Sequence, residues 1–258
     1  MTKIHLETFG KGKSIVLVHG WAMHAGIWRE FAKQLAQNYR VTCIDLPGHG
    51  RSEKLDPFIL ERISNELAKA VPEQGCCWLG WSLGATVVLD IADRYPERVS
   101  SLILLAGNPS YTQTEQWPGM NVHSLDEFAE HLHENCQATL LRFLSLQVKG
   151  LPDHKVFLKA LKAAVFECDA PDTKTLQGGL EILKQAELRP VLPGLNIPVS
   201  VILGGLDTLI PVAVGQKMQQ LLPSLELNII DRAGHVPFLS HSLQTLAIIS
   251  RFMDEQCI

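Results

Sequence analysis

The chain of 258 residues contains no apolar run long enough to span a membrane, and Met1 to Glu7 carry no apolar stretch typical of a signal peptide. It also lacks a large excess of charge of one sign. The formal net charge of −4 gives no reason to expect nucleic acid or an anionic membrane as partner. Repeats and low-complexity segments are absent as well. With 46% hydrophobic and 19% charged residues, we expect a globular, monomeric, cytoplasmic protein with an ample core.

Cysteine patterns typical of zinc sites or redox motifs are missing too. The six cysteines, at positions 43, 76, 77, 136, 168 and 257, show no C-x-x-C spacing, and we expect free thiols. His131 and His133 are a weak metal signal, because a spacing of two directs the rings to different sides of a helix. The sequence therefore predicts neither a metal nor another cofactor.

What the sequence does contain is the pentapeptide Gly80-Trp81-Ser82-Leu83-Gly84. Strand-forming residues 76–79 precede it, and a helical pattern over residues 85–95 follows and ends before Pro96. This strand–turn–helix context is the one that a G-x-S-x-G nucleophile elbow requires, with glycines allowing the sharp turn. The helix behind the serine directs its N-terminal dipole at any oxyanion that forms there. We therefore predict that Ser82 is a nucleophile.

A serine nucleophile needs a base and an acid, and both occur downstream in the order Ser, Asp, His. Asp207 follows an expected strand over 198–205, and His235 lies in the loop after an expected strand over 225–230. Both therefore lie at the carboxyl edge of a parallel sheet, where such folds gather their sites. Asp207 could instead be a helix N-cap, and Asp231 is a competing acid. A separate strand end gives the easier hydrogen bond to His235 and favours Asp207.

An oxyanion hole is expected beside the elbow. The strand over 14–18 leads directly into His19-Gly20-Trp21, which supplies a second loop close to the nucleophile. The backbone N–H groups of Trp21 and Leu83 are the candidate donors, each worth roughly 3–4 kcal/mol to a tetrahedral intermediate. The Trp21 ring can at the same time fill the core.

Strand and helix alternate along the chain, with one interruption. This pattern predicts an α/β fold with a mostly parallel central sheet flanked by helices. From residue 110 to residue 187 helical patterns replace the strands, so we expect an all-helical lid inserted after the strand that ends near residue 106. The predicted core comprises residues 1–109 and 188–258, and the lid comprises 110–187. The expected strands cover residues 14–18, 40–45, 76–80, 99–106, 198–205 and 225–230.

Over its whole length the chain resembles the α/β-hydrolases, and more narrowly the pimeloyl-[acyl-carrier protein] methyl ester esterases of biotin synthesis. Trp78-Leu-Gly-Trp-Ser-Leu-Gly84 and Leu17-Val-His-Gly-Trp21 match the elbow and the oxyanion loop. Three segments of the expected lid carry the narrower likeness: Gln116-Trp-Pro-Gly119, Arg142-Phe-Leu-Ser-Leu-Gln147 and Gln177-Gly-Gly-Leu-Glu-Ile-Leu-Lys184.

The resemblance implies hydrolysis of the methyl ester of a pimeloyl chain carried on acyl carrier protein. Ser82 would attack the ester carbonyl, His235 would transfer the proton, and Asp207 would orient the imidazole. The expected lid would supply an apolar channel for the methylenes, lined by Phe143, Leu144 and Leu146. The substrate contacts carried over from the family are Trp21, Ser82, Leu83, Phe143, Leu144, Ser145, Leu146, Gln147 and His235.

A basic stretch within the lid is the candidate docking face for the carrier protein. Arg142, Lys155, Lys159 and Lys162 are the expected contacts, and the three lysines share one helix face by their spacing. The family's lid shows several arginines here, whereas this chain has lysines and places Ala138 where a basic residue is expected. A merely solvated helix face is the alternative interpretation.

Two rival functions remain at this stage. A promiscuous carboxylesterase or C–C bond hydrolase would share Ser82, His235 and Asp207 and differ only in its pocket. A non-catalytic receptor with the same fold would often lose a catalytic residue, and none is missing here.

Overall fold

A computed structural model describes residues 2–255 of the chain. Its centre is a seven-stranded sheet in the order β1-β3-β2-β4-β5-β6-β7. All neighbouring strands run parallel except β1, which pairs antiparallel with β3 at the sheet edge. The strands are β1 Leu6–Phe9, β2 Ser14–Val18, β3 Arg40–Ile44, β4 Cys76–Trp81, β5 Val99–Leu105, β6 Val199–Gly204 and β7 Glu226–Ile230.

The six predicted strands are confirmed with ends that differ by at most one residue. Strands buried on both faces appear in a sequence as short apolar runs, and β2, β4 and β6 have this form. Strand β1 was not predicted, because its four residues, Leu-Glu-Thr-Phe, form no apolar run. It owes its conformation to pairing with β3, a contact between segments distant in sequence.

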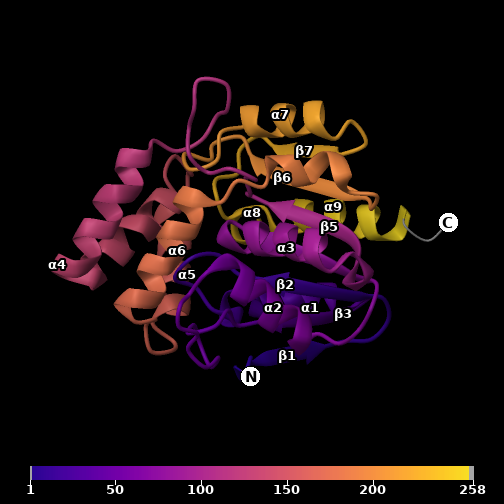
Figure 1. Ribbon diagram of the computed structural model, residues 1–258, viewed down its shortest axis with the longest axis horizontal. Helices are drawn as coiled ribbons and strands as arrows, with labels where there is room; N and C mark the ends of the chain where they lie inside the picture. The colour runs from indigo at the N-terminus through magenta and orange to yellow at the C-terminus, as the bar shows by residue number, and fades with distance from the viewer. Residues whose placement is uncertain (1, 256–258) are drawn as a thin grey trace.

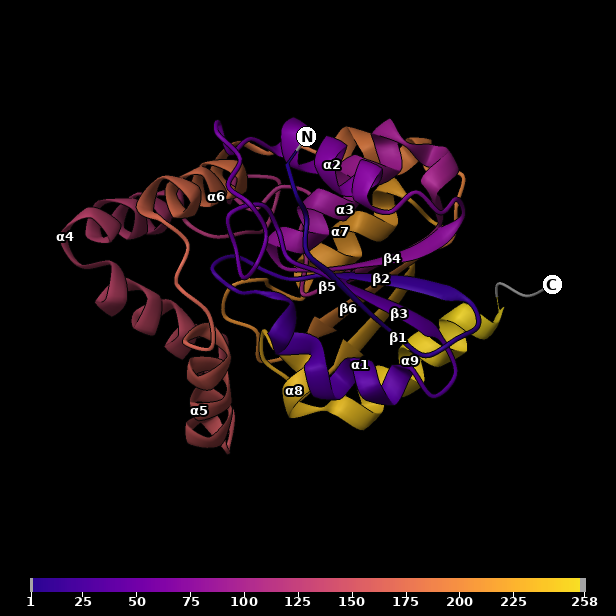
Figure 2. The ribbon, with the colours of Figure 1, turned by 90° about the horizontal axis from the view of Figure 1, so that it is seen from below.

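Helices cover both faces of the sheet (Figure 2). Helices α2, α3 and α7 lie on one face, while α1, α8 and α9 lie on the other (Figure 2). Each face has its own apolar cluster: Val88 of α3 and Met218 of α7 belong to one, and Phe31 of α1 and Ile249 of α9 to the other. The bounds are α1 Arg29–Leu35, α2 Leu60–Ala70, α3 Leu83–Arg94, α7 Ala213–Leu221, α8 Pro237–Ser240 and α9 Ser242–Glu255, with 3₁₀ turns η1 Ala25–Trp28, η2 Pro96–Arg98 and η3 Arg189–Gly194.

Three helices, α4 Val122–Gln147, α5 His154–Val165 and α6 Thr173–Gln185, form an insertion between β5 and β6. They lie together at one end of the sheet (Figure 1). Helix α4 is kinked at Asn135, whose backbone is non-helical and whose side chain accepts a hydrogen bond from the N–H of Ala138 at 3.0 Å. Asn135 therefore ends one helical half and caps the next. Asp172 caps α6 in the same way, through the N–H of Thr175.

Two buried histidines lie side by side beneath the loops at the carboxyl edge of the sheet. The rings of His19 and His49 are 5.3 Å apart between centroids, and both side chains are fully enclosed. Burial lowers the pKa of His49 to about 4 and holds the pKa of His19 well below its ordinary value. The folded protein therefore keeps both imidazoles neutral at pH values where the unfolded chain takes up protons.

This arrangement predicts a loss of stability in mild acid. The folded pKa of His49 is depressed, so its contribution is complete above the unfolded value of 6.5 and is lost as the pH falls toward about 4. The free energy of unfolding should decrease by about 3 kcal/mol over this interval through His49. Urea unfolding at pH 7 and at pH 4.5 measures the difference. The difference in unfolding free energy between the two pH values should become smaller in His49→Gln. It should remain in the control variant His131→Gln, which changes an exposed histidine. An unchanged difference in His49→Gln contradicts the assignment.

Candidate active site

Ser82 lies at the junction of β4 and α3, in a backbone conformation that serine rarely adopts. Its φ is 55° and its ψ is −122°, so the chain turns sharply between strand and helix. A Cβ at Gly80 would collide with the Gly84 carbonyl, and one at Gly84 would collide with the Val18 carbonyl. Both glycines are therefore required by close approach of the backbone. The turn leaves the Ser82 hydroxyl free of the helix cap that a serine usually provides here.

The structure brings Ser82, His235 and Asp207 together in one chain of hydrogen bonds. Ser82 Oγ and His235 Nε2 are 2.8 Å apart, and His235 Nδ1 donates to Asp207 Oδ2 at 2.8 Å. Because an ionised carboxylate can only accept, Nδ1 must be the donor, and Nε2 is then left to accept from the serine hydroxyl. This is the tautomer that a general base needs.

Asp207 uses its second oxygen to cap the following turn. Its Oδ1 accepts from the N–H groups of Leu209 and Ile210 at 2.8 and 3.1 Å. The two roles considered for Asp207 are thus combined in one side chain. Asp231, the competing acid, is exposed, whereas the Asp207 side chain is completely buried.

The His235 backbone is held on two sides by contacts that the sequence did not reveal. Trp81 Nε1 donates to the His235 carbonyl at 2.8 Å, and the His235 N–H donates to the Gln147 carbonyl at 3.1 Å. Trp81 belongs to the elbow itself, so the elbow positions both the nucleophile and its base. The signal in the sequence that could have indicated this contact is the large side chain of Trp81, directly before the serine.

The candidate oxyanion donors lie beside Ser82. A Cβ at Gly20 would approach the Ser82 Cβ to 3.1 Å, so the loop after β2 passes directly over the nucleophile. In the described part of the chain, neither the Trp21 nor the Leu83 N–H donates to an acceptor. His19 fixes this loop by donating from Nδ1 to the Gly20 carbonyl and accepting from the Leu46 N–H at Nε2.

The Trp21 ring connects this loop to the helical insertion. Its Nε1 donates to the Leu176 carbonyl of α6 at 2.8 Å, and its ring meets Phe143 of α4 edge-on at 4.8 Å. A Cβ at Gly179 would collide with the Trp21 indole. A glycine inside a helix lowers stability by about 1 kcal/mol relative to alanine. Here the absence of a side chain permits α6 to pack directly against the indole.

The run from Phe143 to Gln147 does not face the site as a unit, because successive residues of a helix point in different directions. Phe143 and Leu146 pack in the cluster that contains Trp21 and Leu83, whereas Leu144 packs in the cluster on the other face of the sheet. Gln147 is buried beside the His235 loop. The Ser145 side chain is exposed and donates to the Leu141 carbonyl, so the structure places it away from the site.

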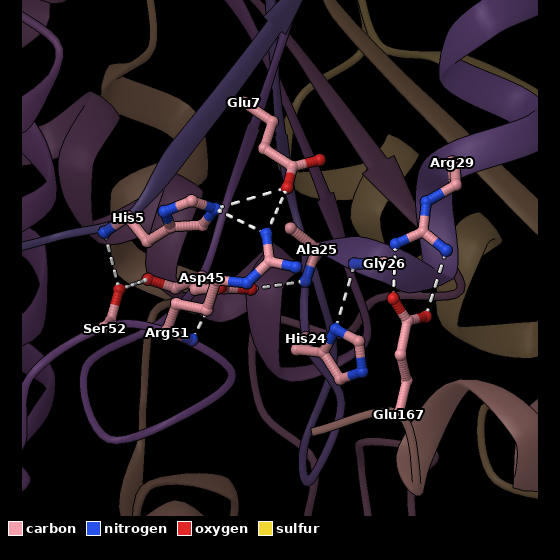
Figure 3. Close-up of polar contacts among 10 residues, drawn as sticks. All are labelled: His5, Glu7, His24, Ala25, Gly26, Arg29, Asp45, Arg51, Ser52 and Glu167. Atoms are coloured by element: carbon pink, nitrogen blue, oxygen red, sulfur yellow. Dashed lines mark hydrogen bonds and ion pairs between the residues drawn. The ribbon is translucent and has the colours of Figure 1, made fainter. Parts of the chain in front are cut away.

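Helix α5 is attached to the core by polar contacts just beyond the oxyanion loop (Figure 3). Arg29 forms two hydrogen bonds to the Glu167 carboxylate, at 3.0 and 2.5 Å. His24 accepts from the Gly26 N–H at Nδ1, and its Nε2 donates to the Ala164 carbonyl at 2.5 Å. Asp45 orders the same turn by accepting from the Ala25 N–H (Figure 3).

The basic face on α5 is open to solvent. Lys155 and Lys159 are exposed, Lys162 is half-buried, and none of them forms an ion pair with any described residue. Arg142 differs from the lysines. Its guanidinium lies 3.7 Å from the Glu127 carboxylate and 5.4 Å from the centroid of the Phe128 ring.

Residues 2–255 also bear on metal binding, membrane insertion and disulfide formation. They contain no group of three or more His, Cys, Asp or Glu side chains placed to hold a metal ion. No helix within these residues has the length and apolar character needed to cross a membrane. The described cysteines, 43, 76, 77, 136 and 168, are free, and Cys257 lies outside the described residues.

The fold and this site define a class of protein. Residues 13–242 match the family model of the alpha/beta hydrolase fold. The chain belongs to the α/β-hydrolase family, and it is a serine hydrolase of the esterase type.

Named relatives show a more specific similarity. The chain is 40% identical over 250 residues to the pimeloyl-[acyl-carrier protein] methyl ester esterase of Methylococcus capsulatus, which covers 97% of this chain and 98% of that protein. Enzymes of the same name from Aliivibrio fischeri and Salmonella newport are 34% and 37% identical. The first of these matches covers 98% of both chains, and the second covers 93% of this chain and 94% of the relative. The matches include the helical insertion.

Solved structures support the fold. An esterase from Exiguobacterium antarcticum superposes with a TM-score of 0.86 at 23% identity, covering 98% of this chain and 96% of that one. A thermophilic esterase from Thermogutta terrifontis gives 0.85 at 20% identity, covering 100% and 95%. At such identities the likeness concerns the architecture and not the substrate.

The geometry predicts unequal effects of two aspartate substitutions. Asp207→Asn keeps an oxygen to cap Leu209 and Ile210 but favours the wrong His235 tautomer, so kcat for a p-nitrophenyl ester should fall roughly 10³- to 10⁴-fold. Asp231→Asn is the matched control and should remain within about two-fold of wild type. Both variants should show the wild-type circular dichroism spectrum. A greater loss in Asp231→Asn would assign the acid to the other residue.

Proposed function

We propose that this protein hydrolyses the methyl ester of pimeloyl-[acyl-carrier protein], releasing methanol and the free carboxylate in biotin synthesis. The observation that carries the proposal is the 40% identity to an enzyme of this name over almost the entire chain, insertion included. The cytoplasm, where acyl carrier proteins operate, is the compartment that this function requires.

Acylation begins with attack by Ser82 Oγ on the carbonyl carbon of the methyl ester. His235 Nε2 takes the hydroxyl proton, while Asp207 holds the imidazole and stabilises its positive charge. The carbonyl oxygen becomes an oxyanion, and the N–H groups of Trp21 and Leu83 stabilise it together with the N-terminus of α3. The intermediate collapses as His235 returns the proton to the departing methoxide, which leaves as methanol.

Deacylation repeats these steps with water. His235 takes a proton from the water as its oxygen attacks the acyl-enzyme carbonyl. The second intermediate breaks the bond to Ser82 Oγ, which regains a proton from His235. The products are the pimeloyl carboxylate, still attached to its carrier, and the free enzyme.

The helical insertion supports this choice of substrate by its position as a lid. Phe143 and Leu146 contribute apolar surface beside Trp21 and Leu83. Burial of each substrate methylene in such surroundings is worth roughly 0.8 kcal/mol, which favours a long acyl chain over acetate. Ser82 is only 4% exposed, so little bulk water reaches the nucleophile.

Genetic complementation tests the proposed function. A bacterial strain that lacks its own pimeloyl-carrier methyl ester esterase should grow without biotin when it expresses this protein. The Ser82→Ala variant, expressed to the same level, should not support growth. Failure of the wild-type protein, combined with activity on small esters, would instead favour a general carboxylesterase.

The basic face of α5 supports recognition of the carrier protein. Lys155, Lys159 and Lys162 lie on a lid helix at the outer margin of the molecule (Figure 2). They have no acidic partner among the residues described, so their charge is available to an acidic partner. Acyl carrier proteins are acidic, and such complementarity accelerates association more than chemistry.

Charge reversal on this face should therefore affect one substrate class selectively. In the variant with Lys155→Glu, Lys159→Glu and Lys162→Glu, KM for the carrier-bound ester should rise about ten-fold or more at low salt, and its dependence on salt should weaken. Hydrolysis of a small p-nitrophenyl ester should stay near the wild-type rate.

A second triple variant controls for net charge. Lys11→Glu, Lys33→Glu and Lys69→Glu replace exposed lysines outside the helical insertion and change the net charge by the same amount. This variant should leave KM for the carrier-bound ester near wild type. Equal KM values for both triple variants would show that the α5 face is merely solvated.

A further inference from the structure

Tyr111 lies in the segment that follows β5, the strand next to the nucleophile's own strand in the sheet. The Ser82 N–H donates to the Leu105 carbonyl at the end of β5, which fixes the two strand ends to each other. Farther along, the backbone at Gly107 runs against Ala85 in the first turn of α3. The chain leading to Tyr111 therefore passes directly beside the elbow.

The loop around Tyr111 is held firmly. Asn108 Oδ1 accepts from both the Ser110 N–H and Trp117 Nε1, and Trp117 Nε1 also donates to the Ser110 carbonyl. The Tyr111 carbonyl accepts from the Met120 N–H at 2.7 Å. Tyr111 is thus placed by its loop and not by its own hydroxyl.

The Tyr111 hydroxyl is buried without a hydrogen-bond partner in the part of the chain that the structure describes. The residue is 2% exposed and belongs to the apolar cluster that includes Trp21, Leu83 and Phe143. An unpaired buried hydroxyl costs about 1–3 kcal/mol, so a phenylalanine would be the more stable choice here. A group that lowers stability beside a nucleophile suggests a role in function.

The groups around this hydroxyl show where it can act. Burial raises the pKa of the Tyr111 phenol well above its ordinary value, and the charge of Asp207 adds to the rise, whereas Ser82, the Asn108 backbone and Thr86 act in the opposite direction. The phenol therefore stays protonated and can only donate toward a developing anion. Thr86 Oγ1 is likewise buried and unpaired among the described residues, and Ser82 Oγ is the reacting atom within this group.

We propose that Tyr111 is a further catalytic residue, whose phenol O–H donates a hydrogen bond to Ser82 Oγ when negative charge develops on that oxygen. No proton is transferred, since the phenol only stabilises the charge. Charge develops on Oγ as the serine loses its proton to His235, and again when Oγ leaves during deacylation. This inference rests on the proposed role of Ser82 as nucleophile.

The order of the strands places Tyr111 and the oxyanion hole on opposite sides of the nucleophile's strand. Trp21 follows β2, which borders β4 on one side, whereas Tyr111 follows β5, which borders β4 on the other. The backbone donors can therefore hold the carbonyl oxygen while Tyr111 approaches Oγ from the opposite side. Each reacting oxygen then has its own donor.

Tyr111→Phe tests the proposal, with p-nitrophenyl acetate as the probe. Hydrogen bonds to charged groups are worth about 1.5–3 kcal/mol, so kcat should fall roughly ten-fold or more while KM changes less than about two-fold. The rate of labelling by a fluorophosphonate should fall in parallel. The melting temperature should stay equal or rise, because the substitution removes an unpaired polar group.

Two further variants separate this role from a structural one. Tyr95→Phe removes a hydroxyl that donates to Asn65 at the far end of α3, and it should keep the wild-type kcat. Thr86→Val removes the other hydroxyl near Tyr111 and should also keep kcat near wild type. If Thr86→Val loses as much activity as Tyr111→Phe, the phenol acts through Thr86 and the proposal is wrong.

The remaining outcomes are equally distinct. Wild-type kcat in Tyr111→Phe overturns the proposal. A lowered melting temperature also overturns it, because it would show that the Tyr111 hydroxyl makes a hydrogen bond that stabilises the fold. Ser82→Ala, assayed alongside, should be inactive. Activity in Ser82→Ala would refute the proposed function itself, whereas an inactive Ser82→Ala with a normal Tyr111→Phe would refute this inference alone.

Discussion

The close approach of three backbone segments around Ser82 is the constraint on which the site depends. Gly80, Gly84 and the end of β2 lie so near one another that no side chain fits between them. This packing holds Ser82 at a φ of 55° and starts α3 directly behind it. A larger residue at either glycine would move β4, α3 or β2, and with them the nucleophile, the helix dipole and the candidate oxyanion donors.

The helical insertion and the catalytic loops are built as one unit, since each inserted helix is bound by a loop of the site. Trp21 donates to the Leu176 carbonyl of α6, and the His235 N–H donates to the Gln147 carbonyl of α4. His24, just beyond the oxyanion loop, binds the last turn of α5. The loops that would carry out the chemistry therefore also contact the helical insertion.

Much of this architecture could be predicted from the sequence, for identifiable reasons. The buried parallel strands appear as apolar runs, and the elbow has a motif whose glycines are required by sterics. Features that depend on contacts between distant segments could not be predicted. Strand β1 owes its existence to β3, and the two hydrogen bonds that hold the His235 backbone come from Trp81 and Gln147. Tyr111 was missed because a tyrosine in a loop carries no motif; only its buried hydroxyl distinguishes it.

The most direct test of the central claim is the mass of the carrier-bound substrate before and after incubation with the purified enzyme. Pimeloyl-carrier methyl ester should lose the mass of one methylene group as the ester becomes an acid, with one methanol released for each carrier converted. Ser82→Ala should leave the mass unchanged. An unchanged carrier mass with active wild-type enzyme, as shown by its hydrolysis of a small ester, would contradict the account.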